Sequence, residues 1–453
     1  MKKAAFHTLG CKVNTYETEV MKSQLKEHGY EITSFHDTAD VYIINTCTVT
    51  NIADQKSRQM LHKARKKNPN AVIAAVGCYA QASREQILAD GSADLIIGSN
   101  QKSRLYELLE EYEKNHQVQE AVDDLKHEKA YEEMFLTTTE DRTRAFLKIQ
   151  DGCNQFCSYC LIPYARGRAR SRSMESVLSE IRTLAEQGFK EVVLTGIHLS
   201  SYGKDLNDEK KTLLQELILE AAKIEGIRRI RLGSLEPNII TEEFIEPLAA
   251  CDKFCPHFHL SMQSGCDETL KRMNRHYTAE EYYSKCQLIR RYFEHPAITT
   301  DVIAGFPQET EEEFEKTLAF VKKVGFAEMH VFKYSRRKGT KADAMSGQVP
   351  DPVKTERSHR LMEAAEEMQK EYIAWYVGRP VEVLTEDEVT CDGEIWRAGH
   401  TKEYVKCLLK CSEPNVILTA VACGVNEKNM IVTERGQADS VTFTCRNFQN
   451  VLE

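Results

Sequence analysis

The sequence predicts an α/β protein built from a parallel-sheet domain, a partial (β/α)6 barrel and a small all-β barrel. Its 453 residues are too many for one ordinary domain. Extended and helical segments alternate from the start of the chain to about residue 370, as in parallel α/β sheets, and short extended segments follow. We therefore expect domains at 1–115, 139–370 and 371–453, with a charged linker at 116–138.

The composition indicates a globular protein without a membrane segment. Apolar residues make up 42% of the chain, and no apolar run approaches the roughly 18–20 residues of a membrane span. The opening MKKAAFHTLGC has no apolar run long enough for a signal peptide, so we expect a cytoplasmic protein. Fifteen cysteines in that reducing compartment favour metal or redox use over a disulfide framework. The net charge of −9 requires that any RNA contact come from a local basic patch.

Three extended apolar segments of the first domain each end in a cysteine, at Cys11, Cys47 and Cys78. Helical text separates them, at intervals that suit βα units feeding a parallel sheet. Because the loops after the carboxyl ends of parallel strands converge on one crevice, we expect these three cysteines to meet in space.

A second α/β stretch begins near Arg144, after charge-rich text at residues 102 to 135 that predicts a terminal helix and a solvated linker. Six repeats are too few for a closed eight-stranded barrel, so we expect an open, partial one. Its strands are expected at RAFLKIQ, KEVVLTG, IRRIRLGS, HFHLSM, ITTDVIAG and AEMHVFKYS.

The last part of the chain follows a long helical stretch from Lys354 to Trp375. It consists of short extended segments, which favour a small β-barrel. The segments are PVEVLTEDEV, EIWRAGHT, YVKCLLK, NVILTAVA, NMIVTER and SVTFTC.

The loop DGCNQFCSYC places Cys153, Cys157 and Cys160 in the spacing CxxxCxxC, directly after a predicted strand. Three thiolates around a four-iron cluster leave one iron open for a substrate or cofactor, as the open position does in catalytic zinc centres. Buried structural thiols are the alternative, but the polar Gly/Asn loop does not resemble core. A zinc knuckle is disfavoured because no fourth Cys or His lies at the required spacing.

This cysteine spacing, with Tyr159 before its last cysteine, resembles the radical S-adenosylmethionine superfamily. The resemblance implies a cluster whose open iron chelates the methionyl group, and reductive cleavage to a 5′-deoxyadenosyl radical. It also implies the partial barrel. The stretches LTGIHLSSYG, RLGSLEP, HLSMQSG and DVIAGFPQET resemble barrel motifs that meet the cofactor, which nominates Thr195, Gly196, Ser234, Glu236, Gln263 and Asp301.

The texts TLGCKVNTYETE, INTCTVTNIAD and GCYAQ around the first three cysteines resemble the amino-terminal domain of the methylthiotransferases. That resemblance implies a second 4Fe–4S cluster held by Cys11, Cys47 and Cys78. One cluster would generate the radical and the other would supply sulfur. Two molecules of S-adenosylmethionine would be used, one as methyl donor and one as radical source. Three chance strand-end thiols are the alternative.

The segment PYARGRARS carries Arg166, Arg168 and Arg170 on a predicted extended loop beside the radical cluster. Guanidinium groups there would suit RNA phosphates, although charge runs are usually solvated surface. Together with HTLGCKVNTYETE, this segment looks most like the branch that thiolates N6-threonylcarbamoyladenosine at position 37 of tRNA. The alternatives are isopentenyl-adenosine in tRNA and an aspartate of a ribosomal protein.

The resemblance also implies partners. These are the tRNA substrate, an electron donor of the flavodoxin or ferredoxin type, and a sulfur donor. The carboxyl-terminal β-barrel resembles the small RNA-binding TRAM barrel of these enzymes, although its acidic residues outnumber its basic ones. An iron–sulfur electron carrier or RNA-binding scaffold without turnover is the alternative from another class.

Overall fold

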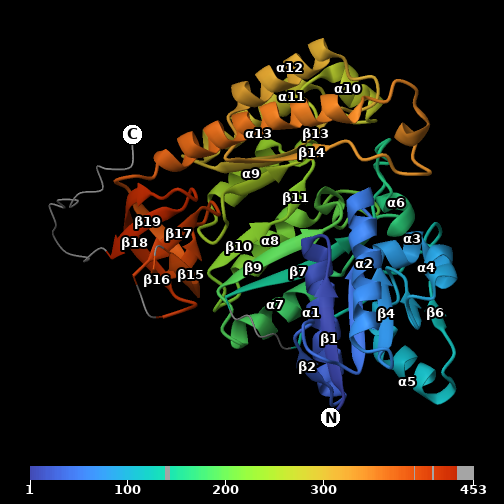
Figure 1. Cartoon of the computed structure of the whole chain (residues 1–453). Helices are drawn as coiled ribbons and strands as arrows, with labels where there is room; N and C mark the ends of the chain where they lie inside the picture. Colours follow the sequence, from blue (N-terminus) through green and yellow to red (C-terminus); the bar gives the residue numbers. More distant parts are fainter. Residues whose placement is uncertain (138–142, 392, 411–412, 436–453) are drawn as a thin grey trace.

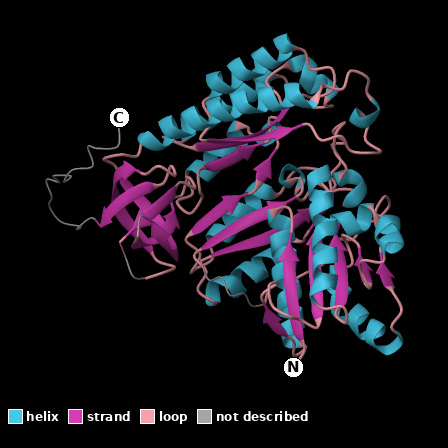
Figure 2. Ribbon diagram, viewed as in Figure 1, coloured by secondary structure: helices cyan, strands magenta, loops and turns pink. Residues whose placement is uncertain are grey.

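The computed structural model describes residues 1–137, 143–391, 393–410 and 413–435 (Figure 1). Two α/β units and a small barrel of strands follow one another along the chain, and a long helix runs between the second unit and the barrel (Figure 2). The predicted fold class is confirmed. No helix in the described ranges combines the length and the apolarity needed to cross a bilayer.

The amino-terminal unit is a six-stranded parallel sheet with the order β2-β1-β3-β4-β5-β6. Its three longest strands are the three predicted ones, and every residue of β3 is buried, as is usual for a strand covered on both faces. The strands are β1 Lys3–Thr8, β2 Glu31–Thr33, β3 Val41–Thr46, β4 Val72–Gly77, β5 Leu95–Ile97 and β6 Gln119–Ala121. The helices are α1 Lys12–Glu27, α2 Asn51–Lys67, α3 Cys78–Ala82, α4 Arg84–Asp90, η1 Lys102–Arg104 and α5 Leu105–Asn115.

The segment expected as a solvated linker differs from the prediction. It contributes β6 to the sheet, and its apolar side chains Leu125, Met134 and Leu136 are buried, whereas Val118 and Phe135 are exposed. Met134 and Leu136 belong to the hydrophobic core that also contains Ala145 of the next unit. These buried apolar residues attach the segment to the protein, while many of its polar and charged residues stay exposed.

The central unit is the expected open barrel of six β/α repeats. One parallel set of strands has the order β10-β9-β7, and the other has the order β11-β12-β13-β14. A single residue, Gly233, separates β10 from β11, so the two sets form one curved wall. The strands are β7 Arg144–Asp151, β9 Glu191–Gly196, β10 Arg229–Leu232, β11 Ser234–Leu235, β12 His257–Leu260, β13 Ala297–Ala304 and β14 Glu328–Lys333, with a short antiparallel β8 Arg170–Ser171 beside β7.

The helices of this unit have local start signals. Thr278 and Thr310 form capping boxes with glutamates three residues later, which satisfies free backbone N–H groups at the starts of α11 and α12. The helices are α6 Ile162–Ala165, α7 Met174–Glu186, η2 Leu199–Ser201, α8 Leu214–Ala222, η3 Pro237–Ile239, α9 Glu242–Ala249, α10 Asp267–Arg272, α11 Ala279–Tyr292, α12 Glu311–Val324, η4 Ala342–Ala344 and α13 Asp351–Ala374.

The amino-terminal unit contacts the open barrel at both of its edges. On the β7 side, Lys148 Nζ donates to Glu17 Oε1 of α1 at 2.9 Å. On the β14 side, Arg337 reaches Asp54 of α2 at 2.7 Å. The lateral gap of the partial barrel is therefore bridged by the domain that carries the first three cysteines.

The carboxyl-terminal unit is a closed five-stranded barrel with the order β15-β16-β17-β19-β18, visible in red in Figure 1. It contacts the central unit through an ion pair, in which Arg229 Nη2 of β10 lies 2.9 Å from Glu382 Oε1 of β15. Five of the six predicted strands are present, and SVTFTC lies outside the described residues. The strands are β15 Pro380–Cys391, β16 Glu394–His400, β17 Lys406–Leu409, β18 Ile417–Val425 and β19 Ile431–Arg435.

Candidate functional site

The loop with Cys153, Cys157 and Cys160 starts directly after β7 and is tied back on itself. The backbone N–H of Cys153 donates to the Gly167 carbonyl at 3.0 Å. Gly152 has a φ of +69°, and a Cβ placed there would lie 1.9 Å from the Arg168 carbonyl oxygen. Only glycine fits this turn, so the loop has a fixed path at the carboxyl end of the strand.

Each sulfur of this loop accepts one hydrogen bond. Backbone N–H groups reach Cys153 Sγ and Cys160 Sγ at 3.4 Å, and Arg275 Nη1 reaches Cys157 Sγ at 3.2 Å. Burial raises the pKa of Cys153 and the pKa of Cys160 to about 12. The free thiols of Cys153 and Cys160 are therefore protonated at neutral pH, and binding of a metal would displace their protons.

Cys11, Cys47 and Cys78 come together, as the strand-end argument predicts. Each follows a strand of the same parallel sheet, at its carboxyl edge. An added Cβ at Gly10 would lie 2.9 Å from Cys47 Sγ, so the residue beside Cys11 touches Cys47. Burial is the main cause that raises the pKa of Cys47 to about 11, and the neighbouring Cys78 and Cys11 act in the same direction.

The Arg166 guanidinium lies between the two cysteine sets and is fully buried. Its Nε lies 3.2 Å from Cys78 Sγ, and its Nη1 lies 2.8 Å from Glu17 Oε1 and 3.1 Å from Asp151 Oδ2. Lys148 Nζ belongs to the same cluster and lies 2.7 Å from Asp151. The expected contact of Arg166 with RNA phosphate is therefore wrong, because the side chain is an interior ion-pair partner.

Of the other arginines of this segment, two are buried and one is exposed. Arg170 is 1% exposed, so its predicted phosphate contact is also wrong. Arg172 is fully buried and pairs with Glu180. Arg168 is exposed, and its guanidinium lies over the Phe156 ring, 4.6 Å from the centroid. Of the three arginines predicted to contact RNA, only Arg168 faces outward.

Two of the nominated cofactor residues lie at the end of β9. Thr195 is buried, and its hydroxyl donates to the Leu147 carbonyl at 3.0 Å, which supports the pairing of β9 with β7. Gly196 allows close packing, because an added Cβ would lie 2.9 Å from Gln150 Cβ.

Two more lie on the next strand segment. Ser234 on β11 is exposed and open to contact. Glu236 pairs with Arg275 at 2.8 Å, the same arginine that donates to Cys157 Sγ. Glu236 is therefore connected to the Cys157 sulfur through Arg275.

Two of the remaining nominated residues, Gln263 and Asp301, lie on the far half of the barrel, and Tyr159 of the cysteine loop reaches toward it. Gln263 adopts a left-handed backbone with φ of +69°, and its N–H donates to the Asp301 carbonyl. The Asp301 carboxylate lies 3.3 Å from His259 Nε2. Tyr159 packs edge-on against Phe306, with ring centroids 6.3 Å apart, which joins the cysteine loop to the end of β13.

Several residues around the site were not predicted. Arg275 follows α10 and lies more than a hundred residues from Cys157, so no local spacing announces it. The backbone N–H of His198 donates to Gln150 Oε1, and its ring Nε2 lies 3.2 Å from Gln155 Nε2. A histidine that closely follows a strand-end glycine was the available signal for His198.

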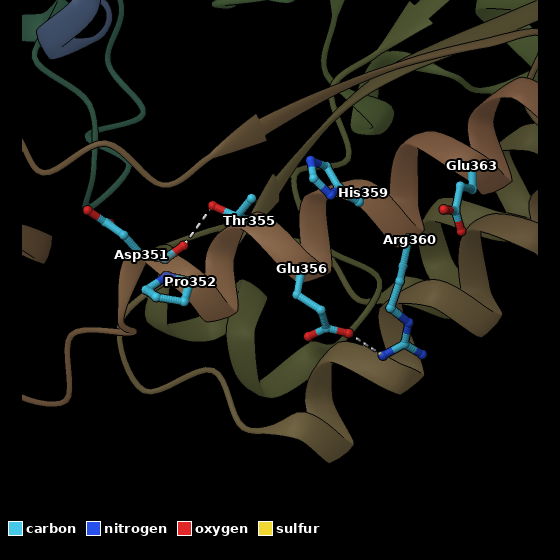
Figure 3. A pocket seen from close by; sticks show the side chains of 7 residues that line it. All are labelled: Asp351, Pro352, Thr355, Glu356, His359, Arg360 and Glu363. Atoms are coloured by element: carbon cyan, nitrogen blue, oxygen red, sulfur yellow. Dashed lines mark hydrogen bonds and ion pairs between the residues drawn. The ribbon is translucent and has the colours of Figure 1, made fainter.

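Other hollows of the described surface do not involve the six cysteines. Figure 3 shows one along the outer side of α13, lined by side chains of that single helix, with Arg360 paired to Glu356. A smaller cavity lies between the central unit and the carboxyl-terminal barrel, and His257, Glu328 and Tyr404 are among the residues that line it.

The donor sets fit iron–sulfur clusters. In the part of the chain that the structure describes, two groups of residues have ligand atoms that all lie within 4.8 Å of one another, as a single metal ion requires. These groups are His259–Asp301–His330 and Cys266–Glu268–Glu313. Each of the two cysteine sets instead offers three sulfur ligands, the donor type that holds iron–sulfur clusters. Soft thiolate donors, three to a set, leave one cluster iron open.

Comparisons with known proteins agree with this chemistry. Residues 147–321 match the Radical SAM superfamily, and residues 3–98 match a family described as uncharacterized protein family UPF0004. Among solved structures, the radical S-adenosylmethionine methyltransferase TsrM from Kitasatospora setae, with cobalamin and a [4Fe-4S] cluster bound, has a TM-score of 0.53 and 16% identity over 76% of this chain and 74% of that chain. This likeness shows a shared fold.

Curated relatives are more similar in sequence. The chain is 44% identical over 415 residues to the threonylcarbamoyladenosine tRNA methylthiotransferase MtaB of Bacillus subtilis (strain 168), covering 91% of each chain. It is 39% identical over 407 residues to the tRNA-2-methylthio-N(6)-dimethylallyladenosine synthase of Acetivibrio thermocellus, covering 88% of this chain and 84% of that one. The prediction of an iron–sulfur enzyme that uses S-adenosylmethionine is confirmed. The chain belongs to the methylthiotransferase family of radical S-adenosylmethionine enzymes.

Proposed function

We propose that this enzyme adds a methylthio group to C2 of N6-threonylcarbamoyladenosine at position 37 of tRNA. The observation that carries the chemistry is the pair of three-cysteine sets, one on each α/β unit, joined through Arg166. The relative with the higher identity of the two compared above is named for this substrate. Action on tRNA places the enzyme in the cytoplasm.

The two cysteine sets have separate roles in this proposal. Cys153, Cys157 and Cys160 hold the cluster that binds S-adenosylmethionine, and Cys11, Cys47 and Cys78 hold the cluster that carries the sulfur to be transferred. When bound, S-adenosylmethionine supplies both a methyl group and a 5′-deoxyadenosyl radical. The protein contributes position and electrostatics, and no side chain need act as a general base for a radical abstraction.

The side chains near Cys157 suit the polar end of the cofactor. Arg275 is held by Glu236 at 2.8 Å and by the Ser261 carbonyl at 3.0 Å. Ser234 is exposed on the adjoining strand. Glu236, Ser234 and Gln263 therefore remain our candidates for contacts to S-adenosylmethionine, with Asp301 deeper in the barrel and the backbone of Thr195 and Gly196 at the end of β9.

Contact with the RNA is assigned to Arg168 and to the carboxyl-terminal TRAM-like barrel. Arg168 projects from the segment that follows the Cys153 loop, where a phosphate contact would hold the anticodon stem near the clusters. An electron donor of the flavodoxin or ferredoxin type and a sulfur donor complete the reaction.

The test is an anaerobic assay of the reconstituted enzyme with S-adenosylmethionine, dithionite and tRNA that carries N6-threonylcarbamoyladenosine without a methylthio group at C2. The nucleosides are then analysed by mass spectrometry. We expect 2-methylthio-N6-threonylcarbamoyladenosine. A product only from tRNA that carries dimethylallyl-adenosine would favour the substrate named for the 39% identical relative. A product only on a ribosomal-protein aspartate would end the tRNA proposal.

Two variants separate the cluster roles. Cys157→Ala should abolish both 5′-deoxyadenosine release and the product, because the radical source is lost. Cys47→Ala should keep 5′-deoxyadenosine release and lose the methylthio product, because only the sulfur carrier is lost. Equal loss of both signals in the two variants would contradict the division of labour.

A further inference from the structure

Arg166 touches residues that flank both cysteine sets. Its Nε donates to Cys78 Sγ at 3.2 Å, and its Nη2 donates to Asn14 Oδ1 at 2.8 Å, three residues after Cys11. Its Nη1 reaches Asp151, two residues before Cys153. The side chain is fully buried, so water does not compete for these contacts.

The Arg166 guanidinium belongs to a buried network of ion pairs. Direct ion pairs link two carboxylates to three cations within this network, and every member is at most 1% exposed. Carboxylates and ammonium or guanidinium groups are rarely buried without partners. These ion pairs hold the Arg166 guanidinium beside the sulfur of Cys78. The members are Glu17, Asp151, Arg166, Lys148 and Lys102.

We infer that Arg166 is a positioning residue that raises the reduction potential of the cluster held by Cys11, Cys47 and Cys78. The inference rests on the proposed function, which assigns a cluster to those cysteines. Hydrogen bonds to cluster sulfurs and nearby positive charge stabilise the reduced, more negative state of an iron–sulfur cluster. Arg166 supplies both at Cys78.

The second cysteine set has a donor of its own. Arg275 Nη1 lies 3.2 Å from Cys157 Sγ, the same separation as that between Arg166 Nε and Cys78 Sγ. Arg275 is paired with the carboxylate of Glu236, whereas Arg166 is paired with both Glu17 and Asp151. Replacing either arginine should therefore change the potential of its own cluster and leave the other unchanged.

The experiment is a potentiometric titration followed by EPR spectroscopy, in a parent protein whose Cys153, Cys157 and Cys160 are all replaced by alanine. The spectrum of this parent reports only the cluster of the first set. The test variant is the double replacement Glu17→Gln with Arg166→Gln, which removes one charge of each sign and the hydrogen bond to Cys78. The matched control is Arg172→Gln with Glu180→Gln, a fully buried pair from the same segment of the chain.

At the midpoint potential of the parent, we expect the ratio of reduced to oxidised cluster to fall about tenfold in the test variant, a shift of ~59 mV for one electron. The control should match the parent. If the double variant does not fold, Arg166→Lys keeps the positive charge and should shift the ratio in the same direction.

An unchanged midpoint in the folded Arg166 variants, or an equal shift in the control, would overturn the inference. A parent that contains about four irons yet titrates identically in every variant overturns the role of Arg166 alone. A parent without any iron–sulfur signal overturns the cluster assignment as well.

Discussion

Replacing Arg337 with methionine should loosen the segment that follows Cys47. The Arg337 guanidinium is nearly buried, and its Nη2 lies 2.8 Å from Thr48 Oγ1 and 2.7 Å from Asp54 Oδ2. It also donates to Asn51. These contacts pin the loop between β3 and α2 to the segment after β14, so the residue holds one cluster loop against the barrel edge.

The expected magnitude follows from the burial of the partner. The Asp54 side chain is 15% exposed, and removal of the guanidinium deprives its carboxylate of this ion pair, although Thr48 Oγ1 still donates to it at 2.8 Å. Breaking a buried ion pair destabilises the folded state by about 3–5 kcal/mol. Because Asp54 is partly exposed, we expect a destabilisation at the lower end of this range, about 3 kcal/mol. Because every ~1.4 kcal/mol is a factor of ten, local opening should become roughly 100-fold more frequent.

Hydrogen–deuterium exchange of the reconstituted enzyme measures this directly. Peptides that cover residues 48 to 54 should exchange roughly 100-fold faster in Arg337→Met. The control is Arg336→Met, because the Arg336 side chain is 61% exposed and its pair with Asp343 is a surface ion pair. The reasoning is refuted if both variants exchange alike, or if faster exchange is spread evenly over the chain.

Three further predictions concern single side chains. Burial lowers the pKa of His198 to about 4 from 6.5, so its neutral form contributes stability that is present above pH 6.5 and is lost as the pH falls towards 4. Denaturation curves should show that loss of about 3 kcal/mol in the wild type and a smaller loss in His198→Gln. Glu17→Ala leaves three buried cations without their shared partner and should lower the melting temperature by about 10 °C, whereas Glu366→Ala, on the surface of α13, should leave it unchanged. Arg168→Ala should weaken tRNA binding and reduce the salt dependence by about one phosphate contact, and an unchanged slope would exclude the contact.

The strands and the cysteine sets were predictable because their signals are local. Each of the longer strands of the sheet and the barrel is an apolar run, and Cys11, Cys47 and Cys78 each follow one. Parallel topology then places strand-end residues at one edge. The three-residue strands β2, β5 and β6 were missed, because so few residues carry no periodicity.

The roles of the arginines were not predictable from spacing. Alternate arginines in a glycine-containing segment resemble a phosphate-binding loop, yet Arg166 is buried against two carboxylates and Arg170 is buried beside Asn100. Glu17 comes from α1 and Asp151 from the end of β7, and only the packing of the two units brings them together. Sequence spacing alone does not reveal the ion-pair partner of a charged side chain when that partner lies more than a hundred residues away.

The count of iron and sulfide on anaerobically reconstituted protein tests the central claim, that two separate three-cysteine sets each hold a four-iron cluster. We predict about eight irons and eight sulfides per chain, falling to about four of each in Cys47→Ala and, independently, in Cys157→Ala. About four irons in the wild type, or a full complement retained in Cys47→Ala, would contradict it.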